Sequence, residues 1–151
     1  MANIVLIKHY KGAPGLRLLG LGPNCIPCQG MKKLREFLNR NAFWAKNRSL
    51  YDLKHCLAKS DVIVSLWEGK EIVGFGRALS DGIYRSVLWD IVIGEHYQGN
   101  GFGKIVVSAI LNSKEIQKSQ KIYLMTTNQR DFYCQLDFEE VQSQKLLLKE
   151  K

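Results

Sequence analysis

The run from Val87 to Ile93 is nearly continuous in apolar residues and leads directly into a glycine-rich loop. An apolar run of this length without regular polar alternation is typical of a central strand that is covered on both faces. The loop has glycines at the alternate positions 99, 101 and 103, and apolar residues recur at helical spacing from Lys104 to Lys118. Strand, loop and helix in this order predict an α/β domain with a binding site at the loop.

The glycine-rich loop has the chemistry to bind a phosphate or a pyrophosphate. Glycine lets backbone N–H groups turn inward without obstruction by a Cβ atom, and the following helix adds partial positive charge at its N-terminus. A P-loop fits poorly, because Ile105 follows Lys104 where that motif requires Ser or Thr. The dinucleotide fingerprint also fits poorly, because the third glycine comes one residue early. A glycine-rich turn without a ligand is the alternative.

The N-terminal part of the chain is expected to form a hairpin and two helices. Two apolar runs, Ile4 to Ile7 and Leu16 to Leu21, flank a turn-forming cluster and predict paired strands. Apolar spacing predicts a helix from Met31, and Ser49 is the expected cap of a second helix.

The remaining segments predict further strands and one short helix. Asp61–Trp67 and Glu71–Leu79 read as an antiparallel hairpin. Ile122–Met125 is predicted as a strand, Gln129–Leu136 as a helix and Lys145–Lys149 as a final strand. We therefore expect residues 1–151 to form one mixed-sheet α/β domain.

Composition narrows the class of protein. The chain has 151 residues of which 46% are hydrophobic, which argues against disorder. No apolar run approaches the length of a membrane helix, and the N-terminus lacks the pattern of a removable signal peptide, so we expect a cytoplasmic protein with reduced cysteines. A metal site is not expected, because Cys25 and Cys28 are not followed by a second pair of ligands at suitable spacing.

The net charge of +8 lies in the N-terminal third. Residues 8–59 contain eleven basic side chains and only two acidic ones, a local balance of +9. This asymmetry predicts a docking face for an anionic partner such as an acidic protein, RNA or a ribosome, with a plain solvated helical face as the alternative. Nucleic acid ranks low, because the chain has no Lys/Arg block and no RNP-like aromatic string.

Two separated motifs resemble those of the GCN5-related N-acetyltransferases (GNAT). Gln98–Gly103 matches the Q/R-x-x-G-x-G/A loop of that family and follows Ile91–Ile93, which resembles its L-x-V strand segment. Further along, Tyr133 to Phe138 resembles the family's tyrosine followed by x-x-x-G-F, with Asp137 in place of the glycine. Segments such as Gly76–Asp81 resemble the small acetyltransferases of cyanobacteria and plastids, a group that includes plant enzymes described as serotonin N-acetyltransferases.

The resemblance implies a GNAT-like fold, with a central, mostly antiparallel twisted sheet of about seven strands and helices on both faces. Residues 1–60 would form a basic acceptor-side portion, and residues 61–140 would bind acetyl-CoA. The strand would pair with the pantetheine arm, the loop would hold the diphosphate, and an amide near the next strand would contact the cofactor. The implied cofactor-binding residues are Ile91, Val92, Ile93, Gln98, Gly99, Asn100, Gly101, Phe102, Gly103, Lys104 and Asn128.

The same resemblance implies catalytic roles. Tyr133 is the expected general acid, because a phenol stays protonated at neutral pH and can give its proton to the departing sulfur. The family's glutamate position is occupied by Val87, so Asp90 is a substitute candidate for the general base, with a capping or pairing role as an equal alternative. Glu95, His96 and ordered water are further candidates.

The resulting hypothesis is an acetyl-CoA-dependent N-acetyltransferase that needs no metal and acts directly on a primary amine. The acceptor is left open between a protein lysine, an N-terminal amine and an arylalkylamine. The alternative is a catalytically inactive acyl-CoA sensor or a ribosome-associated binding module. An acidic protein surface and a second copy of the chain are open as partners, a membrane is not expected, and the compartment is expected to be a bacterial cytoplasm or a plastid stroma.

Overall fold

A computed structural model describes residues 3–151, which fold around one five-stranded sheet. Neighbouring strands are paired in the order β1-β2-β3-β4-β5; the first three pairs are antiparallel, and β4 and β5 are parallel. The strands are β1 (Ile4–Lys8), β2 (Val62–Glu68), β3 (Glu71–Ser80), β4 (Arg85–Ile93) and β5 (Lys121–Tyr123).

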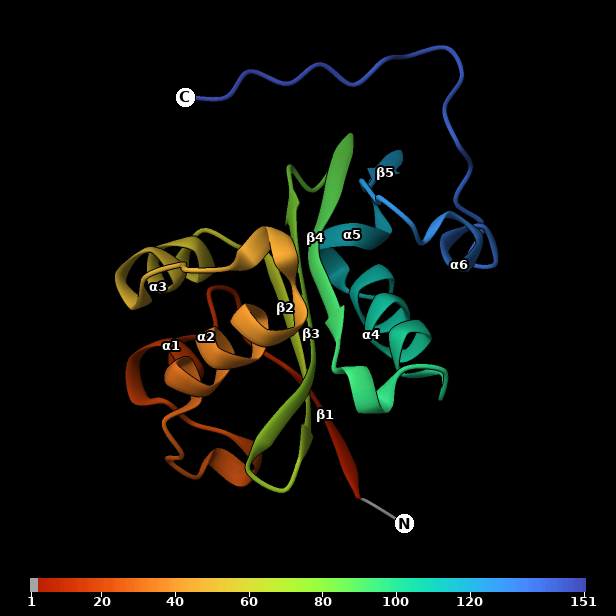
Figure 1. The fold of residues 1–151 in the computed structure, drawn as a ribbon. Coiled ribbons are helices and arrows are strands. Elements are labelled where there is room, and N and C mark those ends of the chain that lie inside the picture. The colour runs from red at the N-terminus through yellow and green to blue at the C-terminus, as the bar shows by residue number, and fades with distance from the viewer. Residues whose placement is uncertain (1–2) are drawn as a thin grey trace.

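Helices cover both faces of the sheet (Figure 1). On one side lie α1 (Pro14–Leu19), α2 (Gly30–Asn41) and α3 (Leu50–Ala58), with the 3₁₀ turns η1 (Pro23–Cys25) and η2 (Phe43–Ala45) between them. On the other lie α4 (Phe102–Leu111), α5 (Lys114–Gln117) and α6 (Arg130–Cys134), and η3 (Glu95–Tyr97) joins β4 to the glycine loop. Each layer buries its own apolar cluster against the sheet, one around Trp67 and Phe75 and the other around Val106 and Ile110.

The expected N-terminal hairpin is wrong in its second half. Leu16–Leu21 does not form a strand; most of this run belongs to α1, which begins at Pro14 and ends before Gly20. Proline at the first turn and a left-handed glycine after the last residue are helix signals, and they override a short apolar run. Only Leu16 of this run is fully buried, so α1 contacts the core mainly through this one side chain.

The sheet has five strands and not about seven. The predicted strand Lys145–Lys149 is not paired, and its three leucines are exposed along the C-terminal segment that runs over the top of the molecule (Figure 1). The predicted helix Lys104–Lys118 is divided, because α4 ends at Leu111 and α5 begins at Lys114.

Two local predictions are confirmed, the cap of α3 and the hairpin of β2 and β3. Ser49 caps α3 by accepting a hydrogen bond from the Asp52 amide at 3.0 Å, and Leu53 and Leu57 are buried on the inner face of that helix. β2 and β3 form the predicted antiparallel hairpin.

Within residues 3–151, no helix is long and apolar enough to cross a bilayer, and no group of three or more potential metal ligands comes together.

Candidate active site

The free edge of β4 is the first feature of the candidate site. β5 pairs only with the first three residues of β4, Arg85–Val87, and no strand within residues 3–151 continues this pairing as far as Ile93. The Gly94 amide donates to Val73 O at 2.9 Å, so the neighbouring pair of Gly74 and Ile93 is a non-hydrogen-bonded pair of the antiparallel ladder. The N–H and C=O of Ile93 therefore point away from β3, toward the open edge.

A β-bulge interrupts β4 just before this edge. Phe75 pairs with Val92 and Arg77 pairs with Trp89, so β4 has one more residue than β3 across this interval. Asp90 occupies the bulge, and its backbone has a left-handed φ of 53°. The bulge places the Asp90 side chain on the same face of the sheet as Arg77, toward the layer of α2 and α3.

The Asp90 carboxylate is almost completely occupied by partners. It accepts from Arg48 at 2.8 and 3.2 Å, from Arg77 Nε at 2.8 Å and from Trp44 Nε1 at 3.0 Å. Only 2% of its side chain is exposed. We call Trp44, Arg48, Arg77 and Asp90 the Asp90 cluster.

The Asp90 cluster bears on the two roles that the sequence left open for this aspartate, general base and structural pairing. Burial alone would raise the pKa of Asp90, but its hydrogen bonds with Arg48 and Arg77 and their charges lower it below the ordinary value. A carboxylate that holds two guanidinium groups and binds a proton weakly is a poor general base. Of the two alternatives, the structural pairing fits the geometry.

Sequence reasoning missed both arginines and the tryptophan of this cluster. Arg77 is 13 residues from Asp90 and Arg48 is 42 residues away, so no local spacing links them. Only the pairing of β3 with β4 and the packing of the α2–α3 connection bring them together. A buried aspartate in an apolar strand was the one available signal, because such a charge requires a partner.

The glycine loop presents a row of unpartnered backbone donors. Among residues 3–151, no group accepts a hydrogen bond from the amides of residues 99–104. Gly99 and Gly101 have φ values of 78° and 82°, a left-handed conformation that glycine adopts without strain. The loop ends at the N-terminus of α4, where Gly101 provides no side-chain cap. Lys104 is exposed in the first turn of this helix.

Side chains of the loop hold it in this shape. Gln98 Nε2 donates to Ile93 O at 3.1 Å, which ties the loop to the open edge of β4. Asn100 Nδ2 bonds to the carbonyls of Tyr97 and Gln98 at 3.3 and 3.1 Å. These side chains satisfy carbonyl acceptors and leave the amide donors free.

Tyr133 lies in the apolar cluster that also includes the open end of β4. Its ring contacts Phe132 and Phe138 edge-on, with centroids 4.9 and 5.9 Å away, and Ile91 and Ile93 pack against the same cluster. Burial raises the pKa of Tyr133 to about 12, so its phenol is protonated at every physiological pH.

Three other candidates lie at the surface. Asn128 is exposed in the bend before α6, and Glu95 and His96 are exposed in η3. None of the hydrogen bonds found among residues 3–151 links the Asn128 side chain to the glycine loop.

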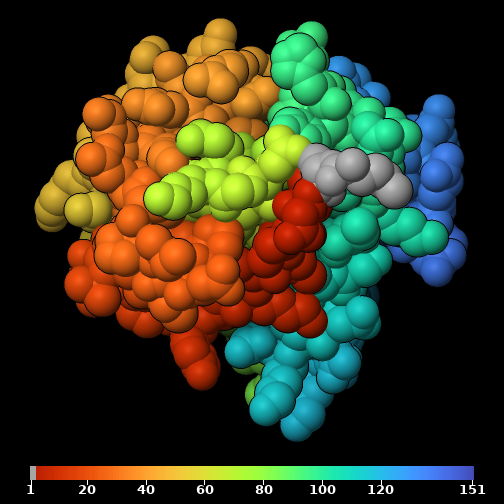
Figure 2. Space-filling model, turned by 90° about the horizontal axis from the view of Figure 1, so that it is seen from below, coloured from red at the N-terminus to blue at the C-terminus, as the bar shows by residue number. Residues whose placement is uncertain are grey.

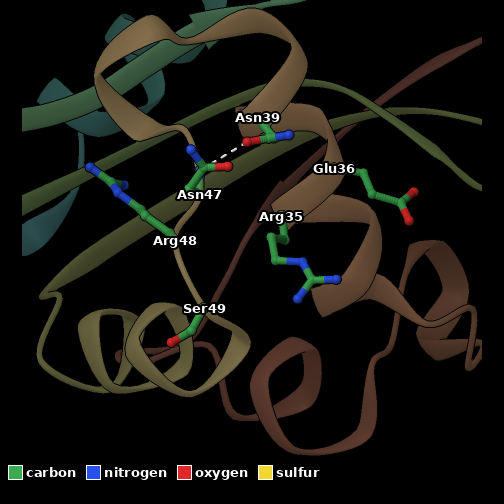
Figure 3. Close-up of a pocket in the computed structure, with 6 residues that line it drawn as sticks. All are labelled: Arg35, Glu36, Asn39, Asn47, Arg48 and Ser49. Atoms are coloured by element: carbon green, nitrogen blue, oxygen red, sulfur yellow. Dashed lines mark hydrogen bonds between the residues drawn. The ribbon is translucent and has the colours of Figure 1, made fainter.

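The layer of α1 to α3 has an open polar pocket of about 380 Å³ between α2 and the start of α3 (Figure 3). Six residues line it, namely Arg35, Glu36, Asn39, Asn47, Arg48 and Ser49. The Asn47 amide donates to Asn39 Oδ1 at 2.9 Å, which fixes the connection to α2. In Figure 3 the Arg48 guanidinium points away from Arg35 and Ser49, which agrees with its pairing to Asp90 on the sheet.

The family model for the acetyltransferase (GNAT) domain matches residues 55–140. The chain belongs to the GNAT acetyltransferase family. The matched region includes β2 to α6, and therefore the free edge of β4, the glycine loop and Tyr133. Acetyltransferases of this family transfer an acetyl group from acetyl-CoA to an amine.

Individual relatives agree with this assignment. The chain is 39% identical over 72 residues to an "uncharacterized N-acetyltransferase ycf52" of Pyropia yezoensis, covering 45% of this chain and 41% of that protein. It is 34% identical over 71 residues to "GCN5-related N-acetyltransferase 2, chloroplastic" of Arabidopsis thaliana, covering 46% and 28%. The chain thus spans less than half the length of these two relatives.

A solved structure of a GNAT-family acetyltransferase from Xanthomonas campestris pv. campestris has the same fold. It superimposes with a TM-score of 0.72 over 100% of this chain and 94% of its own, at 16% sequence identity. The expected GNAT-like architecture, a mixed sheet with helices on both faces, is therefore confirmed, with five strands in this chain.

Proposed function

We propose that this protein is an acetyl-CoA-dependent N-acetyltransferase that transfers the acetyl group directly to a primary amine. The observation that carries the proposal is the row of free amides at residues 99–104 next to the free edge of β4. Backbone donors at a helix N-terminus suit a diphosphate, and an unpaired strand edge suits an extended amide-containing chain. Coenzyme A has both of these parts in the same molecule.

The donor site can be assigned residue by residue on this basis. The diphosphate would accept from the amides of Gly99 to Lys104, and the exposed Lys104 side chain would add positive charge. The pantetheine arm would pair with β4 at Ile91 and Ile93, whereas Val92 is bonded toward β3 and contributes packing. Gln98 would contact the arm at the junction of strand and loop, and Asn128 stays a predicted contact from the next segment.

Tyr133 is our candidate for the proton donor to the departing sulfur. Its high pKa keeps the phenol protonated until the thiolate forms. The same apolar surroundings disfavour a free thiolate, which raises the proton affinity of the sulfur and helps the transfer. Burial thus raises both the pKa of the Tyr133 phenol and the proton affinity of the sulfur.

The acceptor amine must lose a proton before it attacks, and Asp90 does not suit that step. We propose that water carries this proton to the solvent. Arg48 and Arg77 contribute two positive charges against the one negative charge of Asp90, so the Asp90 cluster has a net charge of +1. A net positive cluster near the acceptor disfavours its ammonium form and favours the neutral nucleophile.

The sequence favours two classes of acceptor, a protein amine and an arylalkylamine. We propose that the acceptor is a protein amine. The +9 charge of residues 8–59 suits acidic chain segments and disfavours polyamines. Trp44 of the Asp90 cluster is 50% exposed and its neighbour Phe43 is 66% exposed, and their rings would also suit an arylalkylamine. The chloroplastic Arabidopsis relative supports a plastid or bacterial compartment.

The test is the substitution Tyr133→Phe, assayed with acetyl-CoA and a panel of amines by release of free thiol. We expect kcat to fall about 100-fold, because a general acid contributes roughly that much, while the Kd for acetyl-CoA in calorimetry is unchanged. Tyr123→Phe is the control, since its hydroxyl bonds to Arg85 outside the site.

Two outcomes would contradict the proposal. Unchanged turnover in Tyr133→Phe would remove Tyr133 from the mechanism. If the parent protein binds acetyl-CoA but acetylates none of an acidic lysine peptide, a free N-terminal peptide and an arylalkylamine, the inactive acyl-CoA sensor becomes the better description.

A further inference from the structure

A carboxylate lies next to the candidate diphosphate loop, where an anionic ligand would not be expected to favour it. Glu68, the last residue of β2, accepts a hydrogen bond from the Tyr97 hydroxyl. Tyr97 is the residue directly before Gln98, where the glycine loop begins. Neither the family motif nor the mechanism above assigns a role to this pair.

The ring of Tyr97 is packed at the base of the loop. It lies 6.3 Å from the ring of Phe102, the first residue of α4, and its Cδ2 is 3.4 Å from where a Cβ on Gly94 would lie. Gly94 and Phe102 are the residues at which the chain leaves β4 and enters α4. The ring thus contacts both ends of the loop.

The hydroxyl of Tyr97 ties this base to a distant, fixed part of the sheet. Glu68 is 29 residues away and begins the turn that joins β2 to β3. Lys33 of α2 donates to Lys70 O at 2.7 Å and pairs with Glu71 at 3.1 Å in the same turn. Seen from below, the turn between residues 68 and 71 lies between the N-terminal layer and the green segment that follows β4 (Figure 2).

The other bonds of the loop are local. Gln98 joins the loop to the end of β4, the strand that the loop directly follows, and Asn100 bonds to carbonyls at the start of the loop, so neither side chain reaches a second strand of the sheet. Glu95 N also bonds to Asn41 at 3.3 Å, but this contact holds the start of η3 and not the glycines.

We propose that Glu68 and Tyr97 are positioning residues that hold the diphosphate loop in register with β4. Tyr97 acts by fixing the glycine loop, and Glu68 acts through Tyr97. The free amides then face the ligand before it binds, so less conformational entropy is lost on binding. The inference rests on the proposed function, because it assumes that this loop binds the diphosphate of acetyl-CoA.

The test compares Tyr97→Phe, Glu68→Ala and Glu68→Gln with the parent protein. Tyr97→Phe keeps the ring packing and removes only the hydroxyl, and we expect the Kd and the KM for acetyl-CoA to rise about tenfold while kcat changes less than about twofold. Glu68→Ala should match it, and Glu68→Gln should recover most of the affinity, because its amide oxygen can still accept the bond. The double variant Tyr97→Phe/Glu68→Ala should be no worse than either single variant.

The failure of this inference is distinct from failure of the proposed function. If the parent protein does not bind acetyl-CoA, the proposed function fails. If the parent binds but Tyr97→Phe and Glu68→Ala keep its Kd, or if Glu68→Ala lowers kcat with KM unchanged, the positioning role is wrong. A higher affinity in Glu68→Gln and Glu68→Ala alike would show that the charge of Glu68 only repels the ligand. Thermal melting of each variant separates a loss of affinity from a loss of folded protein.

Discussion

Two helices, α3 and α4, begin in opposite ways. At α3 the Ser49 hydroxyl accepts from the Asp52 amide at 3.0 Å and donates to the Asp52 carboxylate at 2.9 Å. At α4 the corresponding position is Gly101, which has no side chain to cap the helix, and the loop before it adds further free amides. One N-terminus is satisfied within the chain, and the other has free amides that we propose bind a ligand.

The same contrast separates the polar groups around the two helix starts. Next to α3, the donors of Trp44, Arg48 and Arg77 converge on one buried carboxylate. Next to α4, the row of amides faces no acceptor from the described residues. Buried donors without acceptors are costly, so a chain tolerates free donors only where water or a ligand can reach them. The difference therefore separates groups that hold the fold from groups that we propose bind the diphosphate.

The largest expected effect is on stability and comes from substituting Asp90, whose partners lie next to the capped helix α3. Asp90→Ala leaves two partly buried guanidinium groups without their anion, and we expect a loss of about 3 kcal/mol in the free energy of unfolding by urea denaturation. Asp90→Asn keeps an oxygen for the Trp44 bond and should lose less, about 1–2 kcal/mol. A large fall in kcat with unchanged stability would instead restore Asp90 as a base.

The pH dependence of these variants checks the same point. The folded-state pKa of Asp90 is lowered, so its stabilisation is present above the unfolded value of about 3.9 and is lost as the pH falls through the folded pKa. The difference in unfolding free energy between the parent and Asp90→Asn should therefore be constant near neutral pH and shrink below about pH 4. A difference that already shrinks near pH 6 would contradict the assignment.

The second prediction concerns the glycine loop before α4, whose amides have no acceptor among the described residues. In Gly101→Ala the added Cβ meets no atom within 4 Å, so only the φ of 82° opposes it, at a cost of roughly 1–2 kcal/mol. If the loop relaxes to relieve this strain, its amides move, and we expect the acetyl-CoA affinity to fall about tenfold.

Gly82→Ala is the matched control for Gly101→Ala. Gly82 has a φ of 79°, its Cβ would also meet no atom within 4 Å, and it lies in the turn before β4 rather than in the loop. Both variants should lose similar stability, and only Gly101→Ala should lose affinity in calorimetry. Equal affinities in the two variants would show that the loop shape is not what binds.

The contrast also marks what could be predicted from the sequence. The loop was found because its glycines, strand and helix are contiguous, and the hairpin of β2 and β3 and the cap at Ser49 were found for the same reason. The second half of the N-terminal hairpin was wrong because the apolar run at Leu16 outweighed the proline and glycine that mark the ends of α1.

What the sequence could not reveal depends on contacts between distant segments. The partners of Asp90 are 13, 42 and 46 residues away, and Glu68 is 29 residues from Tyr97. The bulge in β4 shifts the register by one residue and decides which face Asp90 occupies, and no local pattern predicts it. The Lys145–Lys149 segment shows the converse, because an apolar run forms a strand only when an edge pairs with it.

The smallest predicted effect returns to α3. Ser49→Ala removes the cap and should lower the free energy of unfolding by about 1 kcal/mol, whereas Ser49→Thr keeps a hydroxyl in place and should recover most of it. Neither change should alter the Kd for acetyl-CoA, because the α3 terminus is satisfied without a ligand. Urea denaturation and calorimetry on the same samples check both statements. If Ser49→Ala weakened acetyl-CoA binding as much as Gly101→Ala does, the two helix starts would share one role, and the distinction between the paired and the unpaired terminus would have to be abandoned.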